Sequence, residues 1–243
     1  MTKIMSYILT FLIMTPLYAI DTALIPVSID TSNKEALQRG AQLYMNYCSG
    51  CHSLRYMRYN HMAKDLGLTT FDGQIDTDLL HNNLVFTQAK IQDPIEISMP
   101  EADARQWFGR VPPDLSLTAR ERSPSWIYTY LKSFYADSKR PFHSNNLLVP
   151  DVAMPNILAP LGGITVVKNP HTKNPSLVLI ENGEMTEQQF DHAIRDLVTF
   201  LSYVAEPVKT TRISIGLNVL PFLFLLLIVV YLLKRSYWKR VAR

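Results

Sequence analysis

The sequence predicts a mainly α-helical domain with long loop insertions, followed by one C-terminal transmembrane helix. Apolar residues recur at spacings of three and four in several separate stretches, the pattern of an amphipathic helix. Between these stretches lies a long segment without sustained periodicity. Near the C-terminus, Ile213–Leu233 runs for 21 residues without a formal charge. Since about 20 apolar residues span the bilayer core as a helix, we expect this segment to cross a membrane.

The first 19 residues have the features of a signal peptide. Lys3 precedes the apolar run Ile4–Leu17, and the small residue Ala19 stands at the expected cleavage point. The alternative is an uncleaved N-terminal membrane anchor, which the short apolar run disfavours. Under either interpretation we expect the domain that follows to be exported.

Three helices are expected before the long irregular segment. The first begins near Asn33 and carries apolar residues at helical spacing as far as Cys48. The second covers Glu101–Phe108, and the third covers about Pro124–Tyr135. Ser123 is the expected N-cap of the third helix, because serine accepts from free backbone N–H groups and proline suits the first helical position.

The last soluble helix has the clearest pattern. Thr186 and Gln189 form a capping box ahead of a long amphipathic stretch, which Pro207 ends. The preceding stretch Ala136–Thr186 is rich in Pro, Gly and Asn, so we interpret it as long loops with a short hairpin around Ile164–Leu179. Helices that enclose such loops indicate a core completed by something other than side chains.

We therefore divide the chain into a signal peptide (1–19), an exported domain (20–208), a transmembrane anchor (209–233) and a basic tail (234–243). The tail has five Lys or Arg and no acid, which places it in the cytoplasm. Ile20–Thr211 holds 17 of the 24 basic residues and all 21 acidic ones, a net charge of −4. Such a domain is a poor nucleic-acid binder and a suitable docking surface for a basic protein.

Cys48 and Cys51 are the only cysteines, and with His52 they form C-x-x-C-H, the attachment signature of c-type haem. Two thiols one helical turn apart add to the two haem vinyl groups, and the adjacent histidine becomes the proximal iron ligand. A thioredoxin-like disulfide oxidoreductase is the alternative, but its motif begins a helix after a strand, whereas this one ends a helical pattern. A Cys-rich zinc site would need a second Cys pair. One motif predicts one covalent haem c.

The residues alone leave the sixth iron ligand open. Met57 and Met62 follow His52 too closely to reach the other haem face, and Met185 and His192 belong to the last soluble helix. The other candidates are two methionines that precede prolines, and four histidines: Met99, Met154, His61, His81, His143 and His171. A thioether ligand raises the iron potential, as suits an electron acceptor, although most methionines are core filler.

Several elements together resemble the cytochrome c1 family, the haem subunit of ubiquinol–cytochrome c oxidoreductase. Gly40 and Tyr44 before the motif resemble the residues with which the first cytochrome c helix crosses the last, where Phe200 and Tyr203 are the matching aromatics. Three further motifs occur in the family's order: Cys51–Tyr56, Trp107–Ser116 with its Pro-Pro-Asp-Leu-Ser element, and Val149–Pro155. The resemblance covers nearly the whole mature chain.

The resemblance implies a cytochrome c-like haem domain in which Met154 is the axial methionine. It places Arg122 near a haem propionate and Tyr128 in the same region, with Arg120 as a competing candidate that the sequence cannot separate from Arg122. Pro113 would help to fix a haem-edge loop. Mitochondrial relatives carry asparagines where this chain has aromatic residues just before the glycine ahead of Pro-Pro, so the chain resembles proteobacterial members.

The resemblance also implies outer-sphere electron transfer, with no residue acting as acid, base or nucleophile. The chain would accept an electron from a Rieske iron–sulfur protein and pass it to cytochrome c. It would sit beside cytochrome b and membrane lipid in a dimeric, multi-subunit complex of the inner membrane, with its haem domain in the periplasm. The alternatives are a free-standing anchored cytochrome c that donates to an oxidase or reductase, and a haem sensor or peroxidase with an open sixth site.

Overall fold

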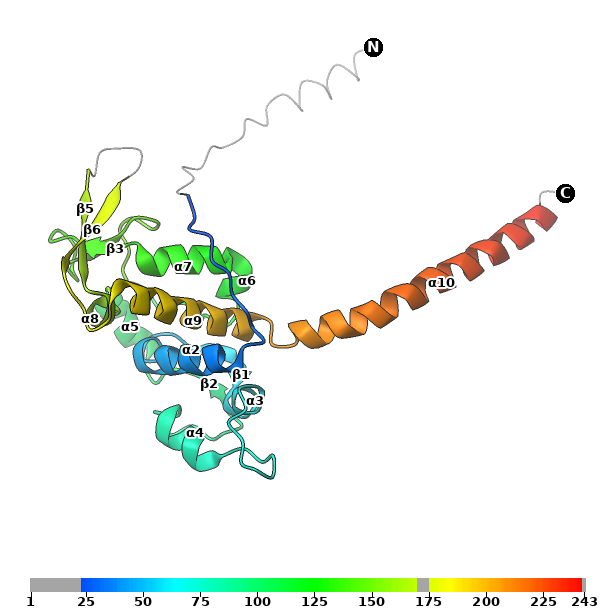
Figure 1. Ribbon diagram of the computed structural model, residues 1–243, viewed down its shortest axis with the longest axis horizontal. Helices are drawn as coiled ribbons and strands as arrows, with labels where there is room; N and C mark the ends of the chain where they lie inside the picture. The colour runs from blue at the N-terminus through cyan, green and yellow to red at the C-terminus, as the bar shows by residue number, and fades with distance from the viewer. Residues whose placement is uncertain (1–22, 170–174, 242–243) are drawn as a thin grey trace, which may run out of the picture.

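The computed structural model describes residues 23–169 and 175–241. The expected signal peptide, residues 1–19, and the last two residues of the basic tail lie outside the described residues. Figure 1 shows a domain of short helices and small hairpins from which one long helix, α10, extends away. The mainly α-helical fold class predicted from the sequence is confirmed.

Two crossing helices, α2 (Lys34–Tyr47) and α9 (Glu187–Ala205), form the centre of the domain. Gly40 lies at the crossing, where an added Cβ atom would stand 2.2 Å from the carbonyl oxygen of Asp196 and 2.7 Å from Cβ of Phe200. The crossing therefore requires glycine. One turn later the rings of Tyr44 and Phe200 pack with centroids 5.8 Å apart, as the resemblance implied.

Side-chain caps begin several of the helices, and the caps of α7 (Pro124–Lys132) and α9 were predicted from the sequence. Asn33 accepts from the backbone N–H of Ala36 at the start of α2, and Thr186 and Gln189 form the full capping box of α9. Ser123 accepts from the backbone N–H of Trp126 at the start of α7. Each cap satisfies a backbone donor that lacks a partner inside its helix.

The third predicted helix ends at Lys132, three residues early. Phe134–Ala136 forms strand β3 instead, which pairs antiparallel with β4 (Ser144–Asn146). The predicted hairpin around residue 164 is confirmed as β5 (Ile164–Lys168) with β6 (Ser176–Glu181). The second predicted helix is confirmed as α5 (Glu101–Phe108).

The remaining elements are short segments of two to seven residues. They are β1 (Leu54–Arg58), α3 (Tyr59–Asp65), α4 (Thr77–Asn83), β2 (Pro94–Ile95), α6 (Thr118–Arg122) and α8 (Ala159–Gly162). β1 and β2 pair antiparallel. α6 and α7 both pack on α9, and Figure 1 shows α9 lying between α7 and α2.

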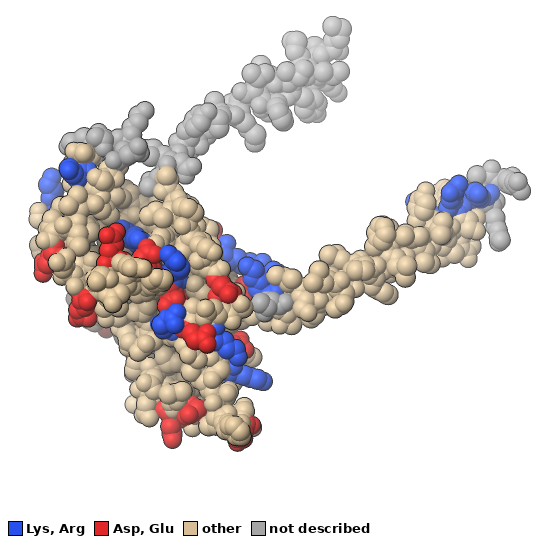
Figure 2. Space-filling model, viewed as in Figure 1, with Lys and Arg blue, Asp and Glu red and all other residues tan. Residues whose placement is uncertain are grey.

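The long C-terminal helix α10 covers Lys209–Val241 and contains Pro221. Its stretch Thr211–Lys239 is long and apolar enough to cross a membrane, and none of its most apolar window is buried against the domain. Figure 2 shows basic side chains at both ends of α10 and uncharged ones between them. A helix that is apolar on every face needs lipid around it, so the protein is anchored in a membrane.

Candidate haem site

A cavity of about 560 Å³ lies where four segments that are distant in the sequence meet. Three of them are the C-x-x-C-H motif, the stretch 108–131 that holds the Pro-Pro-Asp-Leu element with helices α6 and α7, and the segment from residue 149 to 157. Leu197 and Leu201 of α9 complete the lining. Six of the residues that we expected at a haem lie on this one lining: Cys48, Cys51, His52, Pro113, Arg122 and Met154.

The end of α2 brings the motif to the cavity. The backbone N–H groups of Cys51 and His52 both donate to the carbonyl of Cys48, at 3.0 and 2.9 Å, so the chain turns tightly between the two sulfurs. The buried hydroxyl of Tyr44 donates to the carbonyl of His52 and fixes the end of the turn. No disulfide joins the two cysteines, and before haem attachment burial, with a smaller effect of Cys51, raises the pKa of the Cys48 thiol to about 12.

The imidazole of His52 is oriented by the Pro-Pro-Asp-Leu-Ser element. Its Nδ1 lies 2.7 Å from the carbonyl oxygen of Pro113. When Nδ1 donates its proton there, the lone pair of the ring is on Nε2, the arrangement of a metal-binding histidine. Burial lowers the pKa of His52, opposed by this hydrogen bond and by the charge of Asp114, so the neutral form that can bind iron is favoured.

The Pro113 carbonyl is itself held in place by contacts to the chain just after the motif. The carboxylate of Asp114 accepts from the backbone N–H groups of Arg55 and Ser116, at 2.8 and 2.9 Å. The N–H of Leu115 donates to the carbonyl of Ser53 at 2.9 Å. The element therefore positions the histidine through its backbone.

Met154 lies in the irregular segment after β4, and buried polar side chains hold that segment. Asn146 accepts from the backbone N–H groups of Leu148 and Val149, at 2.9 and 3.1 Å. Ser144 accepts from the N–H of Asn156 at 3.2 Å. The sulfur of Met154 accepts a hydrogen bond from the Tyr130 hydroxyl, 3.3 Å away.

The structure separates the candidates that the residues alone left open. Among the described residues, Met154 is the only methionine and His52 the only histidine on the cavity lining. Met99 lies elsewhere, and His171 lies outside the described residues. Arg122 lines the cavity and Arg120 does not.

Arg122 is the cationic group on this lining that the family resemblance had indicated. Its side chain is 55% exposed, lies 3.4 Å from the carboxylate of Glu121, and places its Cζ 5.5 Å from the ring centroid of Trp126. The cavity is also lined by three residues that the sequence had not indicated: Arg110, Trp126 and Tyr130. The spacing of these two aromatic residues by four on the predicted third helix could have identified them.

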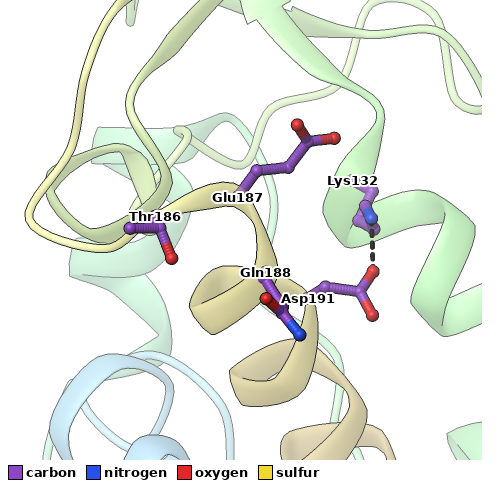
Figure 3. A pocket seen from close by; sticks show the side chains of 5 residues that line it. All are labelled: Lys132, Thr186, Glu187, Gln188 and Asp191. Atoms are coloured by element: carbon purple, nitrogen blue, oxygen red, sulfur yellow. Dashed lines mark hydrogen bonds and ion pairs between the residues drawn. The ribbon is translucent and has the colours of Figure 1, made fainter.

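Tyr128 does not line the cavity, in contrast to the expectation from the resemblance. Its hydroxyl donates to Asp191 of α9, and its ring is buried. The same carboxylate pairs with Lys132 at 2.6 Å and with Arg195 at 2.7 Å. Figure 3 shows Lys132 of α7 and Asp191 of α9 facing each other beside the start of α9. Tyr128 therefore joins two helices, because its side chain leaves α7 on the face toward α9.

The donors at the cavity fit a c-type haem. Two thiols can form thioethers, an imidazole and a thioether can bind iron, and the lining is mostly apolar. Within residues 23–169 and 175–241, no three His, Cys, Asp or Glu side chains gather as ligands for a bare metal ion. The imidazole and the thioether together suit an iron that brings its own four ring nitrogens.

Comparison with known proteins gives a match along most of the chain. The family model described as "Cytochrome C1 family" matches residues 27–241. "Cytochrome c1" of Allochromatium vinosum is 45% identical, over 96% of this chain and 97% of that protein. "Ammonia monooxygenase gamma subunit" of Nitrosomonas europaea is 42% identical, over 88% and 86%. "Cytochrome c1" of Rhodospirillum rubrum is 28% identical, over 84% and 81%.

Proposed function

The chain belongs to the cytochrome c1 family, and we propose that it accepts single electrons from a Rieske iron–sulfur protein and passes them to a cytochrome c during quinol oxidation. As a member of that family it carries one covalent haem c and serves in respiratory electron transport. The observation that carries the proposal is the meeting of the C-x-x-C-H motif and Met154 at one cavity.

We assign the haem contacts from the lining of that cavity. Cys48 and Cys51 would hold the haem through two thioether bonds, and His52 Nε2 and Met154 Sδ would bind its iron. When bound, the haem supplies a reversible one-electron change at its iron, with a potential that a methionine ligand raises. The carbonyl of Pro113 keeps the imidazole in the orientation and tautomer that present Nε2.

The protein's other contributions are electrostatic and steric. The apolar side chains of the cavity exclude water from the ligand sulfur, and no side chain has to move a proton. Arg122 is partly exposed on the lining, which suits a guanidinium that pairs with a haem propionate at the cavity edge. Tyr128 is left out of the haem contacts, because its hydroxyl is bonded to Asp191.

The membrane arrangement follows from the ends of the chain. After removal of residues 1–19, residues 20–208 form the periplasmic haem domain, 209–233 the inner-membrane anchor and 234–243 the cytoplasmic tail. The anchor packs beside cytochrome b and lipid in a dimeric, multi-subunit complex. The net charge of −4 on Ile20–Thr211 steers a basic cytochrome c to the exposed haem edge at a salt-dependent rate.

Purification in mild detergent tests the assignment to a complex. We expect this chain to co-purify with a b-type haem and a Rieske centre, and quinol to reduce its haem only when the Rieske centre is present. Recovery of the chain alone with its haem, still reducible in membranes that lack the Rieske protein, would instead support the free-standing anchored cytochrome.

A further inference from the structure

One hydroxyl in the cavity reaches an expected iron ligand. The side chains of Tyr130, on α7, and Met154, in the segment after β4, both line the cavity. The Tyr130 hydroxyl donates to the Met154 sulfur across 3.3 Å. This donor is neutral and lies on a helix that packs on α9.

The ring of Tyr130 has little freedom to turn away from the sulfur. It stacks on Trp126 with centroids 5.2 Å apart and an interplanar angle of 6°. Phe134 meets it edge-on, at 5.2 Å and 73°. Packing on one face and at an edge therefore holds the hydroxyl where the sulfur lies.

Tyr130 is joined to the Met154 segment a second time, through its backbone. Its carbonyl accepts from the side-chain amide of Asn146 at 2.8 Å. Asn146 is 1% exposed, and its oxygen accepts from the N–H groups of Leu148 and Val149. Tyr130 of α7 therefore contacts both the start of the segment and the sulfur near its end.

We propose that Tyr130 positions the Met154 thioether and raises the midpoint potential of the haem, an inference that rests on the proposed role of Met154 as axial ligand. A thioether sulfur has two lone pairs, and an O–H that occupies one leaves the other for iron. The hydrogen bond also draws electron density from the sulfur. Ferric iron needs that density more than ferrous iron, so the reduced state is favoured.

Redox titration of the haem-loaded membrane protein tests this inference. Tyr130→Phe keeps the ring and removes the donor, and we expect the ferrous–ferric equilibrium to shift toward ferric by about fivefold, the size of one neutral hydrogen bond. For a one-electron couple that lowers the midpoint by about 40 mV. Tyr128→Phe is the matched control: it removes a hydroxyl from the same helix, but one bonded to Asp191, and the midpoint should not change.

A second substitution, which should shift the midpoint potential in the opposite direction, makes the test independent of any loss of packing. Tyr130→3-fluorotyrosine keeps the ring and donates more strongly, so the midpoint should rise. A midpoint that is unchanged in both position-130 variants, or that moves in the same direction in both, would overturn the inference.

The far-red absorption band of ferric thioether-ligated haem separates this failure from a failure of the axial assignment. If the band is present and Met154→Leu abolishes it, a null result at position 130 removes only the role of Tyr130. If Met154→Leu leaves spectrum and midpoint unchanged, the axial assignment itself is wrong and the inference fails with it.

Discussion

Tyr128 and Tyr130 stand two residues apart on α7, yet their hydroxyls reach different partners. Since side chains two apart point to different sides of a helix, one hydroxyl meets Asp191 on α9 and the other meets the Met154 sulfur in the cavity. The same geometry distinguishes Arg120 from Arg122 on α6, of which only Arg122 lines the cavity. At this scale, the chemistry of a residue depends on its helix face.

The two arginines give a matched pair for measuring a propionate contact. Arg122→Gln should lower the haem midpoint potential by the equivalent of about a twofold shift in the redox equilibrium, because a half-exposed ion pair is worth only about 0.5 kcal/mol. Arg120→Gln should leave the potential unchanged. Equal effects in redox titrations of the two variants would remove Arg122 from the haem contacts.

The residues of the site were predictable to different degrees. Cys48, Cys51 and His52 are recognisable because the attachment chemistry needs them within one turn of chain. Met154 could be chosen over Met99 only through the family resemblance, since a ligand far away in sequence leaves no local periodicity. The contact between Tyr130 and that sulfur depends on how α7 packs against a loop, which no sequence spacing encodes.

At the scale of elements, long periodic helices were predicted and short elements were not. α9 has a capping box and an apolar face along its whole length, so its beginning could be predicted to the residue. β3 and β4 have three residues each, too few to show the alternation of apolar and polar residues that indicates a strand. Their pairing depends on tertiary contacts, and it shortens α7 relative to the sequence prediction.

The crossing of α2 and α9 depends on one glycine. Gly40→Ala should destabilise the domain by about 3 kcal/mol, because the added Cβ meets the Asp196 carbonyl at 2.2 Å and neither backbone can yield cheaply. This outweighs the gain of about 1 kcal/mol that alanine normally gives in a helix. Gly216→Ala, on α10 outside the domain and with no heavy atom within 4 Å of the new Cβ, is the control. Thermal unfolding followed at the haem band should show a lower midpoint temperature for Gly40→Ala alone.

The contact between α7 and α9 should depend on pH through Asp191. Burial raises the pKa of this carboxyl, but hydrogen bonds from Lys132 and Tyr128 and the charges of Lys132 and Arg195 bring it below its ordinary value of 3.8. A lowered folded-state pKa stabilises the fold above the unfolded pKa, and this stability is lost as pH falls through the folded value.

Asp191→Asn tests this dependence. At neutral pH the variant should be less stable by about 1 kcal/mol, after allowance for partial exposure. The difference should begin to shrink as pH falls to about 4, the ordinary carboxyl pKa, and be lost once pH falls through the lower pKa of the folded state. Denaturant unfolding of both proteins across this pH range measures it. A constant difference at all pH values would mean that the carboxylate charge is not what joins the helices.

At the scale of the whole molecule, the charge distribution divides the chain into two environments. The part of the chain ahead of α10 carries every acidic residue, and five of the last ten residues are basic. Between them, α10 carries apolar side chains on all sides. Sequence composition predicted this span, because the length and hydropathy of a membrane helix do not depend on tertiary contacts. α10 continues to Val241, so the predicted basic tail extends the membrane helix.

Sidedness can be measured by placing a single reporter cysteine in each environment. Ser236→Cys should react with a membrane-impermeant thiol reagent only in inside-out vesicles, because basic tails remain in the cytoplasm. Thr70→Cys, in an exposed turn of the domain, should react only in right-side-out vesicles. Labelling of both positions from the same side would contradict the proposed single crossing.

The central claim is that Met154 completes the iron coordination at the cavity that holds Cys48, Cys51 and His52. The most direct measurement is the absorption spectrum and midpoint potential of the purified haem protein carrying Met154→Leu, beside Met99→Leu as control. We predict that Met154→Leu loses the far-red thioether band and falls in potential, while Met99→Leu keeps both. An unchanged spectrum and potential in Met154→Leu would contradict the account.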